Sequence, residues 1–244
     1  MSEAYGSFAF AYDAALGERF FGAVVPVLQG VVASARVDPP AHLDLACGSG
    51  LALAWSAGEG LRSVGVDASL SMLGIARGRA TELVAGDLRR IPLRGTFGLV
   101  TCLYDSLNHL MTRGDLRAAF DGVREVLAPR GSFVFDVNHP DVYPRIWGIA
   151  EPYVSRDAAH ELSIETRWSA ARGRGEAHVT GWARQGGTTV RIDEWRRQRA
   201  WSEDVITTLL RKSGLDSAEV IPFNPFDESD EHPAKLVFVV RQRL

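Results

Sequence analysis

The 244-residue chain has little cysteine and no excess of basic charge. Its two cysteines, Cys47 and Cys102, form no CxxC pair and are too few for a disulfide framework, so both suit a reducing compartment. With 27 basic residues against 30 acidic ones, the formal net charge is -3. The chain therefore lacks the strong positive field that nonspecific binding to nucleic acid requires, and we expect no nucleic-acid partner.

Signals for export, membrane insertion and metal binding are also missing from the sequence. No basic stretch leads into an apolar stretch after Met1, and no later segment reads as apolar for long enough to cross a bilayer. No HExxH motif or other metal-ligand spacing occurs among the histidines. We therefore expect a cytoplasmic protein without a membrane partner or a metal site, either a monomer or a homodimer.

Short apolar segments alternate with helical ones through the first 140 residues, which is typical of an α/β fold with a parallel sheet covered on both faces. An opening helix is predicted over 14–35, with Pro26 as a kink or break. Further helices are predicted over 69–79 and 115–127, and strands over 42–46, 63–66, 83–85, 99–103 and 132–137.

The pattern changes after Pro140. Apolar and polar residues alternate over 153–172, 176–185 and 188–199, which predicts antiparallel strands. A helix from Ser202 to Lys212 follows, and then strands within 215–222 and 236–240 return the chain to the main sheet. We therefore predict one domain made of residues 1–140 and 201–244, with residues 141–200 inserted as an antiparallel subdomain.

A loop of small residues, Asp-Leu-Ala-Cys-Gly-Ser-Gly over 44–50, follows the first predicted strand. Ligands of open parallel sheets bind at the carboxyl ends of the strands, where a helix N-terminus offers N–H groups. Ala46, Gly48 and Gly50 allow a sharp turn and close approach of a ligand. A dinucleotide loop needs one more small residue where Leu53 stands, so the loop argues against a nicotinamide or flavin cofactor.

Acidic residues stand at the ends of three successive predicted strands. Asp67 ends the second strand about twenty residues beyond the loop, where a carboxylate accepts hydrogen bonds from ribose hydroxyls. Asp87 follows the third strand, where it can accept a hydrogen bond from an adenine amino group. Each acid alone reads equally well as a cap or a solvated strand end. Together with Asp44, they favour a nucleoside cofactor.

The segments 44–50, 65–73 and 86–88 resemble the class I S-adenosylmethionine-dependent methyltransferases, with Ala46 where that family has its first loop glycine. The resemblance implies a Rossmann-like α/β fold, with a seven-stranded, mostly parallel sheet and helices on both faces. It implies S-adenosylmethionine as cofactor, leaving as S-adenosylhomocysteine. The cofactor contacts it implies are Tyr5, Asp44, Ala46, Gly48, Gly50, Asp67, Ala68, Met72, Asp87, Leu88, Leu103 and Tyr104.

Residues 5–13, residues 103–110 and the antiparallel insertion resemble a small-molecule subgroup that includes bacterial methyltransferases of nucleotide-linked sugar amines. Residues 194–201 match that subgroup's pattern before the last helix, except that Arg196 replaces the usual histidine. The resemblance implies an insertion that lines an acceptor pocket, and methyl transfer to N or O of a small molecule. A tRNA or protein methyltransferase and a regulator that binds the cofactor without catalysis stay open as alternatives.

Methyl transfer depends on alignment and exclusion of water, and on a base where the acceptor carries a proton. His109 lies just beyond the fourth predicted strand and is the leading base, with capping or packing as the alternative. Tyr12 is the second catalytic candidate because its hydroxyl can orient the acceptor, although packing of an N-terminal helix accounts for it equally well.

Three further features concern the acceptor. Arg196, Arg197 and Arg199 are predicted to lie on a solvated strand face, with a clamp for an anionic acceptor as the alternative. Cys102 lacks the preceding proline and the second cysteine of RNA C5-methyltransferases. Tyr104 stands where nucleic-acid amino methyltransferases begin an Asn-Pro-Pro-aromatic motif. Both absences point away from DNA and RNA.

Overall fold

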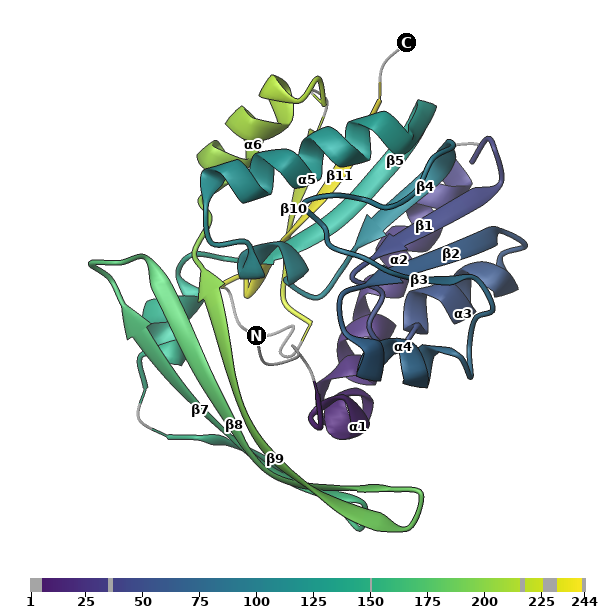
Figure 1. The fold of residues 1–244 in the computed structure, drawn as a ribbon. Helices are drawn as coiled ribbons and strands as arrows, with labels where there is room; N and C mark the ends of the chain where they lie inside the picture. The colour runs from purple at the N-terminus through teal and green to yellow at the C-terminus, as the bar shows by residue number, and fades with distance from the viewer. Residues whose placement is uncertain (1–5, 35–36, 150, 216–217, 226–231, 243–244) are drawn as a thin grey trace.

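The computed structural model describes residues 6–34, 37–149, 151–215, 218–225 and 232–242, which form two sheets (Figure 1). The main sheet has seven strands in the order β10-β11-β5-β4-β1-β2-β3, and β11 runs antiparallel to both of its neighbours. This confirms the predicted mostly parallel sheet. Its strands are β1 (Ala41–Leu45), β2 (Arg62–Asp67), β3 (Leu83–Ala85), β4 (Phe97–Cys102), β5 (Leu127–Asn138), β10 (Ala218–Phe223) and β11 (Lys235–Arg241).

Helices cover both faces of the main sheet. On one face, α5 (Arg113–Val126) and α6 (Glu203–Lys212) pack on alternate strand residues such as Leu43 and Phe135. On the other face, α2 (Glu18–Ser34) and α3 (Leu51–Gly58) pack on the intervening residues, which include Leu99, Val134 and Val237. Because successive strand residues point to opposite faces, strands buried on both sides read as continuous apolar runs, as β4 and β11 do.

The N-terminal helical segment is longer than predicted. It consists of α1 (Ala9–Tyr12), a π-helical turn η1 (Asp13–Gly17) and α2, and Pro26 lies inside α2 without ending it. The buried face of α2, formed by Phe20, Val24, Leu28 and Val31, holds the helix on the sheet despite the hydrogen bond that proline removes.

Contrary to our expectation, one segment, Ala9–Ser34, is long and apolar enough to meet the length and composition of a membrane span. In the structure, the buried residues of α2 lie in a cluster with Leu99 and Val239 of the main sheet. Core helices that pack on a sheet have the same composition, so the segment is weak evidence for a membrane span.

The inserted sheet has four antiparallel strands, β6 (Tyr153–Arg156), β7 (His160–Ser169), β8 (Arg174–Gln185) and β9 (Thr188–Arg199). The first two were predicted as one segment. A turn separates them, because Asp157 Oδ1 accepts hydrogen bonds from the backbone N–H groups of Ala159 and His160 at 2.6 and 2.8 Å. The later turns contain Gly173, and Gly186 with Gly187, all with positive φ.

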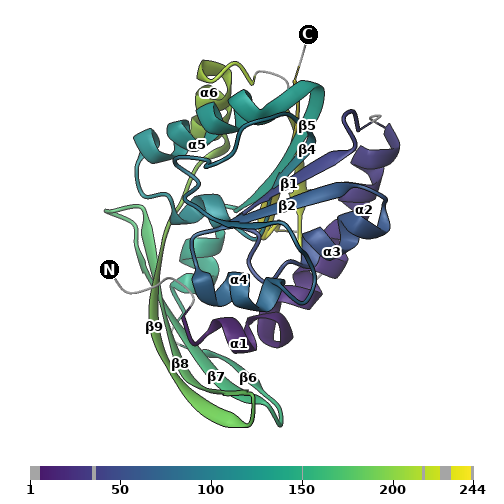
Figure 2. The ribbon, with the colours of Figure 1, turned by 45° about the vertical axis from the view of Figure 1, so that its right-hand side comes forward.

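One face of the inserted sheet covers the N-terminal helical segment. Phe8 and Ala11 are buried together with Leu162, Val179 and Ile192 of the inserted strands. Figures 1 and 2 both show α1 between the inserted sheet and α4 (Leu70–Ala76), near the carboxyl ends of β1 and β2. The carboxyl edge of the main sheet therefore faces the insertion and the first helix.

Candidate functional site

The loop after β1 turns through three residues in the left-handed region. Ala46, Gly48 and Gly50 have φ values of +53°, +52° and +87°. A Cβ on Gly50 would lie 3.2 Å from Cβ of Ala76 in α4, whereas one on Gly48 would meet nothing closer than 4.0 Å. Gly48 is thus required by its backbone conformation, and Gly50 also by close packing. Ala46 adopts the same conformation with a Cβ, which is strained.

Leu53, whose size argued against a dinucleotide loop, packs on a glycine of the next strand. It is buried with Cys47 and Leu73, and a Cβ on Gly65 of β2 would lie 2.6 Å from Leu53 Cδ1. In a dinucleotide fold the small residue sits on the helix to allow close contact with the strand. Here the strand carries the small residue and the helix carries the large one.

Asp44 of β1 is fully buried and belongs to a chain of polar side chains. Thr101 Oγ1 donates to Asp44 Oδ1 at 2.5 Å, and His42 Nε2 lies 2.7 Å from Thr101 Oγ1. His42 Nδ1 lies 2.8 Å from Ser56 Oγ. Burial raises the pKa of Asp44 to about 7, against the opposing hydrogen bond from Thr101, and lowers the pKa of His42 to about 3. Near neutral pH the Asp44 carboxyl is therefore partly protonated, and a cation bound beside it favours the ionised form.

Asp67, at the end of β2, is held by backbone donors. Gly48 N–H donates to its Oδ2 at 2.8 Å, and Ser69 N–H donates to its Oδ1 at 2.7 Å. Burial raises the pKa of Asp67, while these hydrogen bonds oppose the rise. A carboxylate has about four acceptor positions, so its orientation is fixed with capacity left for two ribose hydroxyls.

Asp87, after β3, has a different environment. It is partly exposed and pairs with Arg89, whose backbone N–H and Nε donate to Asp87 Oδ1 at 2.8 and 2.9 Å. The hydrogen bond and charge of Arg89 hold the pKa of Asp87 below its usual range. The acid predicted to contact adenine therefore already has a cationic partner two residues away.

Two adjoining cavities open at this edge of the main sheet. The larger, of about 400 Å³, and a smaller one of about 50 Å³ share Tyr12, Ala46, Gly48 and Tyr104 in their walls. Asp44 and Leu103 line the smaller cavity, which lies beside the glycine loop. The larger cavity is lined by ten of the predicted site residues: Tyr12, Ala46, Gly48, Asp67, Ala68, Met72, Asp87, Leu88, Tyr104 and His109.

Among the described residues, one predicted cofactor residue is absent from both walls. Gly50 lines neither cavity, because it caps α3 and packs against α4. Its role as a cofactor contact stays a prediction. Tyr5 lies outside the described residues.

His109 ends the short helix η2 (Ser106–His109) and is half-buried in the wall of the larger cavity. Its Nδ1 lies 2.9 Å from the carbonyl oxygen of Arg197 on β9. A carbonyl only accepts, so Nδ1 carries the proton and Nε2 is the basic nitrogen of the neutral ring. Burial lowers the pKa of His109, and the charge of Asp105 partly offsets this. The ring is thus neutral at physiological pH and able to accept a proton.

Arg196 does not lie on a solvated strand face, so that prediction is wrong. Its side chain is only 10% exposed, lines the larger cavity and pairs with Glu194. Arg197 alternates to the outer face and pairs with Glu176, while Arg199 stacks on Trp201. The period of two along β9 places 194, 196 and 198 on the inner face, and this signal was available in the sequence.

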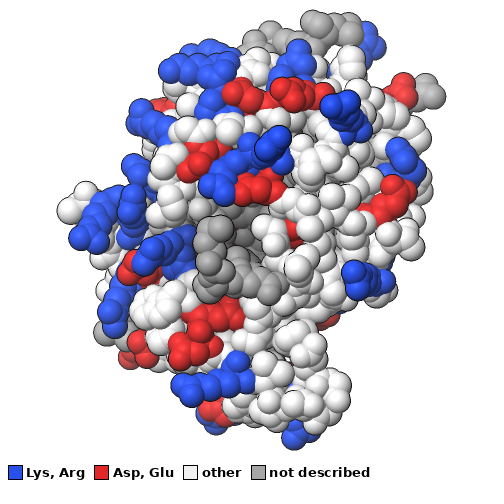
Figure 3. Space-filling model, viewed as in Figure 1, with Lys and Arg blue, Asp and Glu red and all other residues white. Residues whose placement is uncertain are grey.

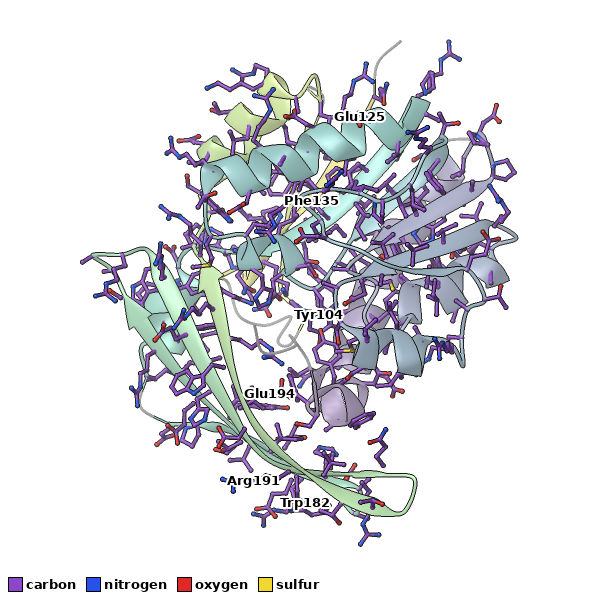
Figure 4. All side chains as sticks on the ribbon, in the orientation of Figure 1. Tyr104, Glu125, Phe135, Trp182, Arg191 and Glu194 are labelled. Atoms are coloured by element: carbon purple, nitrogen blue, oxygen red, sulfur yellow. The ribbon has the colours of Figure 1, made fainter. Side chains whose placement is uncertain are left out.

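Side chains from the N-terminal helices tie both walls of the cavity together. Asp13 accepts from Ser49 Oγ at 2.5 Å and pairs with Arg79 at 2.6 Å. On the opposite side, Glu194 Oε1 accepts from Ser7 Oγ at 3.0 Å and from Phe8 N–H at 2.9 Å. Figure 4 shows Glu194 on β9 near the start of α1, and Tyr104 at the carboxyl edge of the main sheet. The helical segment therefore bridges the glycine loop and the inserted sheet.

Further lining residues were not predicted as site residues. Some lie within the motif segments 44–50, 65–73 and 86–88, some on loops, and some on the helices α2, α3 and α5. They are Ser69, Gly86, Arg89, Ser106, Leu110, Met111 and Asp115 in the larger cavity, and Phe20, Phe21, Cys47, Ser49, Leu51 and Ala52 in the smaller one. No group of three or more His, Cys, Asp or Glu side chains suited to a metal occurs among the described residues.

The cavity walls fit S-adenosylmethionine. Asp44 lies beside the smaller cavity, where a carboxylate with a pKa of about 7 suits the amino group of the methionine part. Asp67 and Asp87 line the larger cavity at the ends of adjacent strands, as ribose and adenine recognition requires. The apolar walls from Met72 and Leu88 suit an adenine ring.

Comparisons with known proteins agree with this fit. Residues 43–131 match a family model described as a methyltransferase domain. The protein YqeM of Bacillus subtilis, named as a methyltransferase, is 30% identical over 184 residues, covering 71% of this chain and 72% of that protein. A Geobacillus protein, also named as a methyltransferase, is 28% identical over 262 residues, which cover 98% of this chain and 99% of that protein. A dTDP-3-amino-3,6-dideoxy-alpha-D-glucopyranose N,N-dimethyltransferase of Streptomyces fradiae is 35% identical over 96 residues, covering 38% of each.

Solved structures share the fold. An S-adenosylmethionine-dependent methyltransferase of Clostridium acetobutylicum has a TM-score of 0.77 at 21% identity, covering 98% of this chain and 99% of that one. CalS10, an amino pentose methyltransferase of Micromonospora echinaspora with bound S-adenosylmethionine, has a TM-score of 0.71 at 20% identity. The match covers 99% of this chain and 100% of CalS10. The sugar N-methyltransferase KedS8 of Streptoalloteichus has a TM-score of 0.74 at 19% identity. The match covers 100% of this chain and 94% of KedS8. The chain belongs to the S-adenosylmethionine-dependent methyltransferases.

Proposed function

We propose that this methyltransferase acts on the amine nitrogen of a small sugar-like molecule, with His109 as the proton acceptor. The observation that carries the proposal is the hydrogen bond from His109 Nδ1 to the Arg197 carbonyl, which leaves Nε2 as the basic nitrogen beside the cofactor cavity. The acceptor class is supported by the relatives that act on amino sugars.

The cavity also supports a small acceptor over a macromolecule. Arg196 of β9 and Tyr12 of the N-terminal helix both lie in the wall of the larger cavity. On the face drawn in Figure 3, basic and acidic side chains are interspersed, which does not suit a phosphate backbone. Residues 141–200 then form the acceptor side of the site, and residues 1–140 and 201–244 the cofactor side.

When bound, S-adenosylmethionine supplies a methyl group on a cationic sulfur. Asp44, Asp67 and Asp87 bind and orient the cofactor from the strand ends, and the rings of Tyr12 and Tyr104 help to exclude water. The lone pair of the acceptor nitrogen forms the new N–C bond as the C–S bond breaks. The proton that the nitrogen gives up passes to Nε2 of His109.

The test is a mass-spectrometric assay with S-adenosylmethionine and an amino sugar. dTDP-3-amino-3,6-dideoxyglucose serves as the probe, and the matching 3-hydroxy sugar nucleotide serves as the control. We expect a mass increase of one or two methyl groups with the amine and none with the hydroxyl compound. Methylation of the hydroxyl compound, or of tRNA or protein with no reaction of sugar amines, would overturn the proposal.

The cellular and oligomeric assignments stay predictions. We propose a cytoplasmic location and a monomeric or homodimeric state. Light scattering and fractionation of the expressing cells test them.

A further inference from the structure

A buried cluster of charged and amide side chains lies behind the site. Lys235 of β11 is 2% exposed. Its Nζ donates to Asp105 Oδ1 at 2.5 Å, to Asp136 Oδ2 at 2.8 Å and to Asn138 Oδ1 at 3.2 Å. Gln198 of β9 donates through Nε2 to Asp105 and accepts from Asn138 Nδ2 at 2.8 Å. The cluster thus joins β5, β11, the loop after β4 and the inserted sheet.

Burial of these charges is expensive. Burial alone would lower the pKa of Lys235, but Asp105 and Asp136 outweigh it and raise that pKa, so the ammonium stays charged. Burial raises the pKa of Asp136, yet three donors bind it, which favours the carboxylate. Well-packed apolar side chains often stabilise a fold as well as a buried ion pair does. A cluster of this kind is therefore better explained by the geometry it imposes than by stability.

The geometry it imposes is that of the loop after β4. Tyr104 and Asp105 have φ values of +67° and +49°, a conformation that costs about 1–3 kcal/mol for each non-glycine residue. Their backbone N–H groups donate to the two oxygens of Asp136 at 2.5 and 2.9 Å. The Asp105 side chain is anchored by Lys235 and Gln198. The strained turn is held from the main sheet and from the insertion together.

Both walls of the site depend on this turn. Tyr104 lines both cavities. The centroid of its ring lies 4.2 Å from the ring centroid of Phe20 and 5.2 Å from that of Tyr12. Asp105 is the N-cap of η2, the helix that ends at His109. On β9, Gln198 immediately follows Arg197, whose carbonyl accepts from His109. The cluster therefore fixes the helix that carries His109 and the strand to which His109 binds.

We propose that Gln198, Asp105 and Lys235 are positioning residues that hold the ring of His109 in one tautomer and at one distance from the cofactor wall. The inference rests on the proposed role of His109. It adds to that role a contact that aligns His109, namely the hydrogen bond from Gln198 of the inserted sheet to Asp105 in the turn after β4.

The experiment is NMR of the full chain bound to S-adenosylhomocysteine, with ¹⁵N-labelled histidine. Wild type should show His109 as the Nδ1–H tautomer, and Gln198→Leu should show a mixture of both tautomers. Gln242→Leu is the control, since Gln242 is also buried but lies just after the far end of β11. Retention of a pure Nδ1–H tautomer in Gln198→Leu, or the same mixture in Gln242→Leu, would overturn the proposal.

Asp105→Asn provides a second variant that keeps the side-chain shape. The charge of Asp105 raises the pKa of His109, whereas Arg196 and Lys235 lower it. Loss of that charge should lower the pKa of His109 in any case, so the readout is the tautomer. The variant loses the ion pair with Lys235 and should show a mixture of both tautomers, and a pure Nδ1–H tautomer would contradict the proposal.

A kinetic measurement separates this inference from the proposed function. With the dTDP-amino sugar as acceptor, Gln198→Leu should lower kcat at least tenfold while its Kd for S-adenosylhomocysteine stays within twofold. A Kd that rises in parallel with the fall in kcat would reject the positioning role. If wild type fails to methylate the sugar amine but the tautomer change is present, the proposed acceptor is wrong and the positioning of His109 stands.

Discussion

The proposed cofactor side and the proposed acceptor side of the cavity are held together in different ways. Two cofactor acids are fixed by residues two positions away, Asp67 by Ser69 and Asp87 by Arg89. On the acceptor side, His109 binds a carbonyl 88 residues away, and Glu194 binds a backbone N–H 186 residues away. The proposed cofactor side is thus more local in sequence than the proposed acceptor side, although Thr101 donates to Asp44 across 57 residues. The acceptor side forms only when the insertion packs on the rest of the chain.

This difference predicts where variants act. Changes on the cofactor side should alter affinity, because strand ends present preformed groups. Changes on the acceptor side should alter turnover, because alignment there depends on contacts between distant segments.

The largest effect is expected for His109→Ala. Loss of a general base lowers kcat by about 10²–10⁴-fold, and affinity for S-adenosylhomocysteine should change little. Steady-state kinetics and calorimetry measure the two quantities. His178→Ala is the control, because His178 pairs with Asp193 on the outer face of the inserted sheet. Wild-type turnover in His109→Ala would remove His109 as the base.

Asp67→Ala should act on affinity instead. Removal of hydrogen bonds between a carboxylate and two ribose hydroxyls costs about 3 kcal/mol, or about a hundredfold in Kd. Calorimetry with S-adenosylhomocysteine tests this, with Asp193→Ala as a matched loss of an exposed carboxylate. An unchanged Kd would refute the ribose assignment and the expectation that cofactor-side variants act on affinity.

The pH dependence of cofactor affinity tests Asp44. Its pKa in the folded protein is raised to about 7, so the carboxylate that pairs with an amino group predominates only above that pH. The Kd of S-adenosylhomocysteine should therefore rise as pH falls below about 7, by about tenfold per pH unit. Thr101→Val removes the donor that opposes the rise, and should move the midpoint to higher pH. A flat profile would contradict the assignment.

The smallest effect is expected for Ala46→Gly. Ala46 has a φ of +53°, and glycine relieves that strain but is more flexible in the unfolded chain, so the gain in unfolding free energy is about 0.5–1 kcal/mol. Urea unfolding measures it. Ala52→Gly, inside α3, should instead destabilise by about 1 kcal/mol. Destabilisation by Ala46→Gly would mean that the loop relies on the Cβ of Ala46.

The sequence was sufficient for the parts that depend on period and local chemistry. The mostly parallel sheet follows from alternating apolar and helical segments, and its strands lie within a few residues of the predicted ones. Leu53 and Asp87 correctly separated the methyltransferase loop from a dinucleotide loop. The break predicted at Pro26 was wrong, because burial of one face of α2 outweighs one missing hydrogen bond.

Taken alone, the sequence determined the sheet, the glycine loop and the acids at the strand ends, because strand period, small residues and strand-end position are all encoded within a few residues. Only the tertiary structure decided that Gly50 packs close to Ala76 of α4, and that Lys235 lies beneath Tyr104. These outcomes depend on which strand faces which helix. Contacts between residues about a hundred positions apart, such as those of Lys235 and Gln198 with Asp105, leave no local signal in the chain.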